Sequence, residues 1–258
     1  MYQFDSRVRY SETDEQGRLS VTGILNYLQD CSTLQSEDIG LGIEYLKKTR
    51  HAWWLSSWQI IIDRYPVLGE EIVISTWPYD FKGIYAYRNF TIQDKAGNYL
   101  VRANSIWFFY DLEVERPARI RLEDVERYGT GEERLDMEYA PRRITVPEEY
   151  EEKEPVLVMK HHLDTNHHVN NAQYVEIVRE FLPEHFQIGE MRVEYKKAAV
   201  LGDVMYPRIS RITEGYVASL CDEEGRPHAV IWLAEKREGL ESIGGYEGMT
   251  RQDGGKND

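Results

Sequence analysis

The chain has 258 residues, with 31 Lys and Arg against 45 Asp and Glu, and so a formal net charge of −14. Hydrophobic residues make up 41% of it and aromatic residues 12%, which is enough apolar material for a packed core and excludes intrinsic disorder of the whole chain. The acidic balance argues against a protein whose main task is to bind nucleic acid, because phosphate binding needs a basic surface. The length corresponds to one large domain or two small ones.

Nothing in the composition points to a membrane or to an oxidising compartment. The N-terminal residues contain no apolar stretch of the signal-peptide kind, and the best apolar run, Ala229 to Ala234, is far shorter than the roughly 18 residues of a membrane-spanning helix. The two cysteines, Cys31 and Cys221, lie in different halves of the chain, and two reduced core thiols are favoured over a disulfide. We therefore expect a soluble, cytoplasmic protein without membrane insertion.

In chain order, the first half predicts a short strand, a loop, one helix and several strands. Ser20 is a favoured N-cap residue, and an apolar helix face follows at near-helical spacing: Val21, Ile24, Leu25, Leu28 and Leu34. Four apolar runs separated by glycine-bearing turns then predict antiparallel strands: residues 58–62, 71–77, 85–92 and 100–110.

The second half predicts the same order of elements after a charged connection. Residues 132–154 hold thirteen charged residues and two prolines, a composition typical of a solvated linker. A helix capped by Asn170 or Asn171 and stopped by Pro183 comes next. Predicted strands follow at residues 191–195, 204–212, 216–221 and 229–234. Six glycines among the last twenty residues indicate a flexible tail.

Four short matches in register indicate an internal repeat. The loop at Asp14 matches the loop at Asp164 with an offset of 150 residues, and 67–70 matches 200–203 with an offset of 133. The turn 94–97 matches 222–225, and 106–107 matches 231–232. We therefore predict an α+β protein of two similar halves: an N-terminal domain at 1–127, a linker at 128–155, a C-terminal domain at 156–237 and a tail at 238–258.

The two halves differ at their matching loops. The second contains Asp164, Asn166 and His168 just before a helix, whereas the first has Asp14, Gln16 and Arg18 at those positions. Histidine is the side-chain type suited to proton transfer in both directions near neutral pH. The N–H groups at a helix start can stabilise an oxyanion. This pattern predicts one hydrolytic site, in which Asn166 holds a water or substrate oxygen and Asp164 orients the imidazole or polarises the water.

Simpler explanations stand beside this one. Asx residues and histidines before a helix often serve only as caps and turns, and this explanation has about equal weight. A metal site at His161, His162, His167 and His168 is the weaker alternative, because these residues lack the spacing of a zinc-binding helix. Thr165 is expected to point away from the site, by the alternation of an extended loop.

The loop Asp164 to Asn171, followed by Tyr174, resembles the active-site loop of acyl-acyl-carrier-protein (acyl-ACP) thioesterases, the plant plastid enzymes and their bacterial relatives. The segment 193–197 is similar to the Glu-Tyr-Arg-Arg strand of that family. The resemblance implies a tandem double hot-dog fold and hydrolysis of fatty acyl-ACP to free fatty acid, with Asp164, Asn166 and His168 as catalytic residues and no cofactor or metal. It implies acyl carrier protein as the partner; nucleic acid is not expected, and a homodimer is left open.

One departure from the family pattern limits the mechanism. Plant members continue the Glu-Tyr-Arg-Arg strand with Glu-Cys, where this chain has Ala198 and Ala199. A Cys–His covalent route from that position is therefore excluded, and water attack assisted by Asp164, Asn166 and His168 remains, with Asp164 or His168 as the base. We expect the acyl pocket to lie between the first helix and residues 53–62.

Three other functions are weighed against this one. An acyl-coenzyme A thioesterase shares the chemistry, and a charge of −14 does not favour an acidic carrier unless local groups such as Lys196, Lys197, Arg142 or Arg143 offset it. A non-catalytic acyl-binding protein of the same fold is the alternative without chemistry. A dehydratase is disfavoured, because the first repeat offers no histidine between Asp14 and Ser20.

Overall fold

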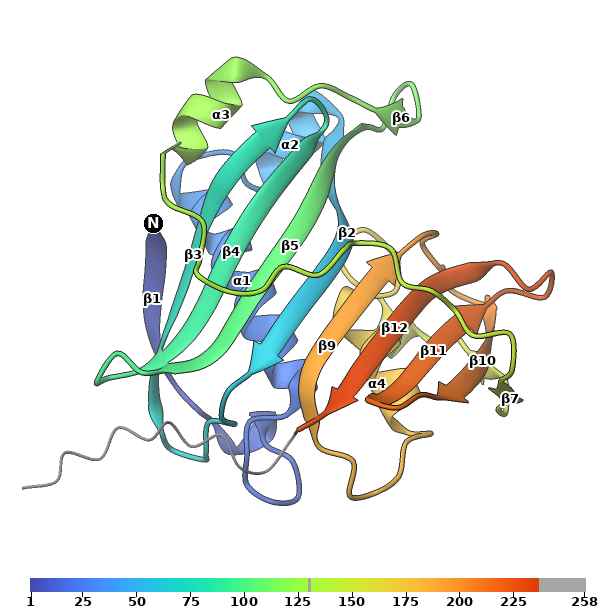
Figure 1. Cartoon of the computed structure of the whole chain (residues 1–258). Coiled ribbons are helices and arrows are strands. Elements are labelled where there is room, and N and C mark those ends of the chain that lie inside the picture. The colour runs from blue at the N-terminus through green and yellow to red at the C-terminus, as the bar shows by residue number, and fades with distance from the viewer. Residues whose placement is uncertain (130, 237–258) are drawn as a thin grey trace, which may run out of the picture.

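The computed structural model describes residues 1–129 and 131–236 (Figure 1). The described residues form four α-helices: α1 (Val21–Asp38), α2 (Ile43–Thr49), α3 (Leu122–Tyr128) and α4 (Asn171–Arg179). The strands of the first half are β1 (Tyr2–Arg7), β2 (His51–Ile62), β3 (Glu71–Lys82), β4 (Tyr85–Asp94), β5 (Tyr99–Asp111) and β6 (Arg116–Pro117). Those of the second are β7 (Glu151–Glu152), β8 (Val156–Leu157), β9 (Ile188–Tyr195), β10 (Val204–Arg211), β11 (Gly215–Cys221) and β12 (Pro227–Glu235). No described helix is long and apolar enough to cross a membrane.

All these strands join one antiparallel sheet whose order runs β1-β3-β4-β5-β2-β9-β12-β11-β10-β7, with β6 on β5 and β8 on β10. The halves meet where β2 pairs with β9, from Ser57 opposite Glu194 to Ile61 opposite Glu190. On each side of this seam the order is the same: the strand after the helix, then the last strand, then the two before it. The repeat inferred from the sequence is thus a repeat of architecture.

The two main helices cover one face of the sheet, α1 behind the first half and α4 behind the second (Figure 1). Ser20 caps α1 by accepting the Gly23 N–H at 3.0 Å, as predicted. The predicted apolar face is buried except for Leu34, which is 42% exposed. Leu34 lies about a third of a turn from Leu28 around the helix, so the buried stripe continues through Cys31 instead.

The first strand after α1 and α2 is longer than the sequence predicted. β2 begins at His51 rather than at Trp58. Its first part was missed because a bulge between Leu55 and Ser57 interrupts the alternation by which strands are recognised. The short helices α2 and α3 were not predicted.

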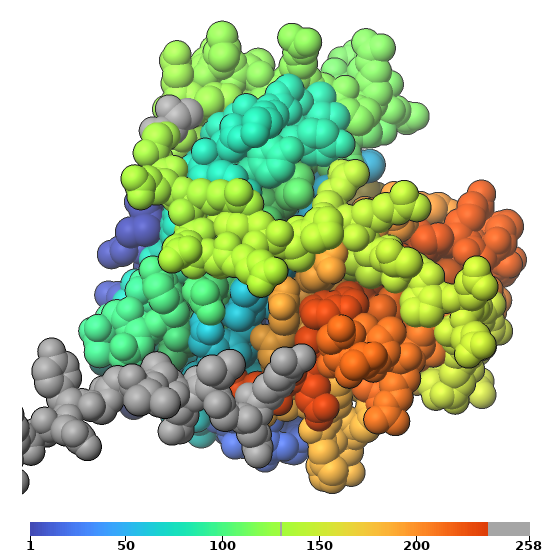
Figure 2. Space-filling view, in the orientation of Figure 1, coloured from blue at the N-terminus to red at the C-terminus, as the bar shows by residue number. Residues whose placement is uncertain are grey.

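The charged linker lies against the other face of the sheet rather than free in solvent (Figure 2). Its backbone accepts the indole N–H of Trp77 at Glu133, and the Gln59 side chain bonds the linker backbone on both sides of Tyr139. Ile144 is only 5% exposed and packs on the outer side of the sheet. The prediction of a solvated linker over the surface therefore holds only in part, since Leu135 and Ile144 are buried whereas Val146 and Tyr150 are exposed. The predicted flexible tail lies outside the described residues.

Candidate active site

The loop before α4 is held in shape by the carboxylate of Asp164. Its Oδ1 atom accepts the backbone N–H groups of Asn166 at 2.7 Å and His168 at 3.3 Å. The Asp164 N–H donates to the His168 carbonyl at 2.8 Å, and His167 has a φ of +61°, so the chain turns back on itself within four residues. This is an Asx turn closed by one side chain, and it places Asn166 and His168 on either side of a tight bend.

The first repeat builds the same loop. Asp14 Oδ1 accepts the N–H groups of Gln16 at 3.0 Å and Arg18 at 2.9 Å, and Gly17 takes the positive φ. The match of Asp14 with Asp164 is therefore a match of backbone geometry.

Both loops are anchored to the turn that was aligned with an offset of 133 residues. Arg18 forms a bridge with Val67, and His168 forms the corresponding bridge with Val200. The Val169 N–H donates to the Ala199 carbonyl at 2.9 Å, so the segment after the Tyr195 strand fixes the end of the loop. The backbone of Ala199, at the position of the cysteine in the Glu-Cys pair of plant members, thus holds the loop in place.

Asn170, not Asn171, is the N-cap of α4, because its Oδ1 accepts the Ala172 N–H at 2.9 Å. Asn171 connects the two halves instead: its amide donates to Gln29 Oε1 on α1 at 3.1 Å, and its carbonyl accepts the Tyr195 hydroxyl at 2.9 Å. The backbone N–H of Asn171 forms no hydrogen bond with any of the residues that the structure describes. A donor is thus left over at the start of the helix, beside the loop.

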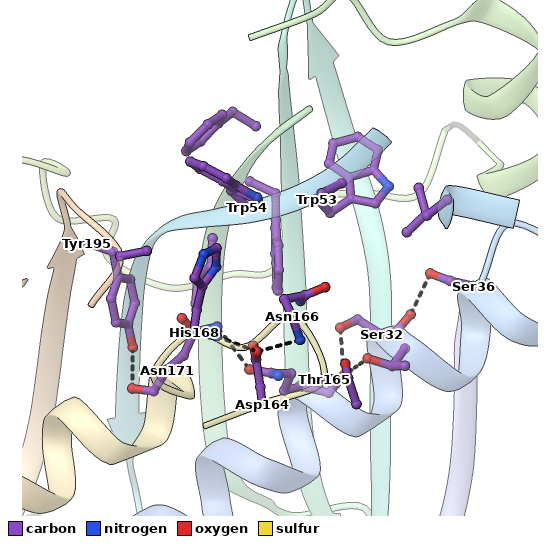
Figure 3. Close-up of a pocket in the computed structure, with 18 of the residues that line it drawn as sticks. Ser32, Ser36, Trp53, Trp54, Asp164, Thr165, Asn166, His168, Asn171 and Tyr195 are labelled. Atoms are coloured by element: carbon purple, nitrogen blue, oxygen red, sulfur yellow. Dashed lines mark hydrogen bonds between the residues drawn. The ribbon is translucent and has the colours of Figure 1, made fainter. Parts of the chain in front are cut away.

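A cavity of about 850 Å³ opens in front of this loop (Figure 3). Asp164, Asn166 and His168 all line it, so the three predicted residues are brought together. The other walls come from α1, α2, the start of β2, the inner side of β4 and β5, and Tyr128. The expected location beside α1 is confirmed, but the β2 part is His51 to Leu55 rather than the following residues up to Ile62.

His168 stands against Trp54, with ring centroids 6.0 Å apart and planes at 90° (Figure 3). Its imidazole forms no hydrogen bond within residues 1–129 and 131–236, and neither does the side-chain amide of Asn166. Both side chains are therefore open to whatever enters the cavity. The Asp164 carboxylate bonds the loop backbone and not the imidazole, so its role as orienter of the ring stays a prediction.

Two side chains in the wall were missed or misplaced by sequence reasoning. Thr165 lines the cavity, contrary to expectation, because the loop is a tight turn in which the alternation of extended chain does not hold. Ser32 of α1 also lines it, but its hydroxyl donates to the Gln29 carbonyl at 2.9 Å, within its own helix. This bond within the helix does not activate the Ser32 hydroxyl as a nucleophile.

The tyrosines of the site are suited to hold hydrogen bonds rather than to take protons. Burial raises the pKa of Tyr174 to about 12 and raises the pKa of Tyr195 well above its ordinary value. Tyr174 accepts the Ala199 N–H at 3.0 Å through its hydroxyl oxygen. Both stay protonated at neutral pH, which leaves the imidazole and the carboxylate for acid–base work.

The basic residues considered for docking are largely occupied. Lys196 lies 2.8 Å from Glu194, and Lys197 lies 3.2 Å from Asp222. Both line the cavity, whereas Arg142 bonds Ser56 from the linker.

The histidines considered as metal ligands do not form a metal site. The Nδ1 atom of His162 is occupied, since it accepts the Met159 N–H at 3.0 Å. Among residues 1–129 and 131–236, no group of three or more His, Cys, Asp or Glu side chains could hold a metal ion.

Two family models match the chain. That of the acyl-ACP thioesterase N-terminal domain matches residues 1–128, and that of the C-terminal domain matches residues 146–227. The chain belongs to the acyl-ACP thioesterase family. Asp164, Asn166 and His168 fall within the match to the C-terminal domain.

Curated relatives of this family are distant in sequence. A chloroplastic acyl-ACP hydrolase of Cuphea viscosissima is 23% identical over 77% of this chain and 51% of its own length. A chloroplastic dodecanoyl-ACP hydrolase of Cinnamomum camphora is 22% identical over 77% of this chain and 56% of its own. The chain thus spans about half the length of the curated relatives it matches.

Solved structures show the fold. An acyl-ACP thioesterase from Bacteroides thetaiotaomicron superposes with a TM-score of 0.81 at 21% identity, over 91% of this chain and 97% of that one. The 12:0-ACP thioesterase of Umbellularia californica gives a TM-score of 0.78 at 18% identity, over 91% and 96%. The predicted tandem double hot-dog fold is confirmed by these likenesses.

Proposed function

We propose that this protein hydrolyses the thioester of fatty acyl-ACP and releases free fatty acid and the carrier thiol. The observation that carries the proposal is the opening of one loop, with Asp164, Asn166 and His168, onto a cavity of about 850 Å³ in a member of this family. The cavity has the volume and the mixed apolar and polar lining of a small-molecule site. We place the protein in the cytoplasm, with acyl carrier protein as its partner.

In the proposed reaction a water molecule attacks the carbonyl carbon of the thioester. Asn166 and the second oxygen of Asp164 hold the water, and a proton passes to His168 as the C–O bond forms. The oxyanion of the tetrahedral intermediate accepts the Asn171 N–H at the start of α4, where the positive end of the helix dipole adds to the stabilisation. The C–S bond then breaks, and the departing thiolate takes the proton from His168.

A covalent route through a cysteine or through a serine of α1 lacks an activated nucleophile. Ala198 lines the cavity where plant members have a glutamate, and the described lining contains no cysteine. Cys31 is fully buried in the core, and burial raises the pKa of its thiol to about 12. Ser32 and Ser36 donate their hydroxyl protons to α1 carbonyls, away from any base.

The test compares His168→Ala with His185→Ala, a matched change at an exposed histidine outside the cavity. Hydrolysis of a mixed acyl-ACP pool is followed by mass spectrometry of the released acids. We expect His168→Ala to lose roughly 10²–10⁴-fold in kcat/KM, with an unchanged Tm, while His185→Ala matches the wild type. Equal activity of both variants would overturn the assignment.

An acyl-coenzyme A thioesterase is the second candidate. It is favoured by the pairing of Lys196 and Lys197 with acids, which reduces the positive charge offered to an acidic carrier. The same acyl chain carried by each thiol separates the two functions through the ratio of kcat/KM values. Protein that retains acyl ligands but hydrolyses neither thioester would be a binding protein of the same fold.

A further inference from the structure

An arginine without an acidic partner lies in the wall of the cavity, away from the catalytic loop. Arg88 of β4 is only 7% exposed, and it lines the cavity. No Asp or Glu among the described residues forms an ion pair with it, although buried charges in proteins are nearly always paired. Its neighbours on the same side of the strand, Ala86 and Phe90, are apolar core residues.

The guanidinium is only partly satisfied by the protein. Its Nη1 atom donates to Gln35 Oε1 and, at 3.0 Å, to Thr76 Oγ1. The guanidinium carbon lies 5.5 Å from the ring centroid of Tyr128, a favourable cation–π distance. The Nε and Nη2 atoms form no hydrogen bond with any residue that the structure describes.

The group is charged at neutral pH. Burial lowers the pKa of Arg88 to about 10, which still leaves it protonated. Burial also raises the pKa of Tyr128, so the neighbouring phenol is neutral and does not balance the charge. The cavity therefore contains an uncompensated positive charge with donors to spare.

Arg88 and His168 lie at opposite ends of the cavity. At one end Gln29 of α1 bonds Asn171, beside the loop. At the other end Gln35 bonds Arg88, and six residues of helix correspond to roughly 9 Å along its axis. Figure 3 shows His168 and Ser36 at these two ends, with Ser32 between them. An acyl chain with its thioester at His168 would extend along α1 toward Arg88.

We propose that the acyl chains taken by this site carry an oxygen acceptor at their far end, a carboxylate foremost and otherwise a hydroxyl or oxo group, which binds Arg88. The inference rests on the proposed function and names its substrate class. A methyl terminus would cover the guanidinium and remove its remaining contact with water, which is costly for a charge. A carboxylate would instead form charge-assisted hydrogen bonds with the free Nε and Nη2 donors.

The test uses thioether analogues of acyl-pantetheine, which bind but cannot be hydrolysed, in matched sets ending in methyl, hydroxyl or carboxylate over a range of chain lengths. For the wild-type protein we expect at least roughly tenfold tighter binding of the best carboxylate-ended analogue than of its methyl-ended partner, as for one charge-assisted hydrogen bond. Arg88→Met should remove this preference, and Arg88→Lys should keep part of it. Arg119→Met, at an exposed arginine outside the cavity, should leave it unchanged.

The outcomes are distinguishable. Equal or tighter binding of methyl-ended analogues by the wild type overturns the inference without any variant. So does an Arg88→Met protein that binds longer plain chains more tightly with no change in terminal preference, since Arg88 would then only close the pocket. Rapid hydrolysis of plain acyl-ACP with no terminal preference leaves the proposed function standing and removes this inference. A preference for carboxylate-ended analogues without any hydrolysis of acyl-ACP leaves this inference standing and removes the proposed function.

Discussion

The guanidinium of Arg18 lies 3.3 Å from the Oδ2 atom of Asp14, through both its Nε and Nη2 atoms. In the first repeat both carboxylate oxygens are thus in use, one by the loop backbone and one by Arg18. In the second repeat His168 stands at the position of Arg18, and Asp164 Oδ2 forms no hydrogen bond with the described residues. One loop is closed by an ion pair, and its counterpart is left open to the cavity.

This difference predicts opposite results for one substitution made in each repeat. Asp164→Asn keeps an oxygen that accepts the loop N–H groups but removes the charge. We expect a loss of roughly 10²–10⁴-fold in kcat/KM, with the free energy of unfolding changed by no more than about 0.5 kcal/mol. Asp14→Asn should cost up to about 1 kcal/mol through the weakened Arg18 pair and leave hydrolysis unchanged. A comparable loss of hydrolysis in both variants would show that the two loops do not differ in role.

The helix caps give a second matched pair. Asn170→Ala and Ser20→Ala each remove a side-chain acceptor from the first turn of a helix, so each should destabilise the protein by about 1 kcal/mol. Only Asn170 precedes Asn171, whose N–H is proposed to hold the oxyanion. We therefore expect kcat to fall in Asn170→Ala alone, as measured at a temperature where both variants are fully folded. A fall of kcat in both variants would show that the effect comes from the loss of helix stability and not from the Asn171 N–H.

The linker supplies a prediction about stability. Ile144 is 5% exposed and packs against Val217 and Val230, whereas Val146 is 42% exposed. Ile144→Ala should lower the free energy of unfolding by about 2–4 kcal/mol, and Val146→Ala by no more than about 0.5 kcal/mol. Urea titration of both variants checks this. Equal midpoints would mean that the linker adds nothing to the stability of the sheet.

Asp222 gives a prediction about pH. Burial of this carboxyl acts to raise its pKa, but hydrogen bonds from the Arg226 backbone and side chain and from Lys197 outweigh burial and hold the pKa well below the ordinary value. A carboxyl with a lowered pKa in the folded state contributes stability above its unfolded pKa of about 3.9, and this contribution is lost as pH falls below that value. The Tm difference between wild type and Asp222→Asn should therefore be largest near neutral pH and shrink below about pH 4. A difference independent of pH would contradict this.

Features fixed by neighbouring residues were predictable from the sequence. The Ser20 cap, the helix start at Asn170 or Asn171 and the tight turns at Asp14 and Asp164 all depend on contacts within a few residues. The alignment of the two loops followed because both turns need the same acceptor at the same spacing. The convergence of Asp164, Asn166 and His168 was predictable for the same reason, because all three lie within one turn.

Features that depend on sheet register were not predictable in the same way. Arg88 reaches the cavity because β4 pairs with β3 and β5 in one register and because Gln35, 53 residues earlier, faces it from α1. A signal was present, since a lone charge stands on an otherwise apolar strand face between Ala86 and Phe90. It gains meaning only when the cavity is known. The burial of Ile144 was not predictable either, because it depends on Val217 of β11 and Val230 of β12, which lie far along the chain.

The seam between β2 and β9 makes each half the completion of the other. Neither strand is an edge while the pairing from Ser57 to Ile61 with Glu194 to Glu190 is intact, and the bond between Gln29 and Asn171 crosses between the same two halves. Cutting the chain in the linker would leave two fragments, each with a long unpaired strand that templates further pairing. When both fragments are present, β2 of one can pair again with β9 of the other, and no strand edge is left at the seam. Either fragment alone would instead pair with a copy of itself, and the pair would then contain two Asp14 loops or two Asp164 loops.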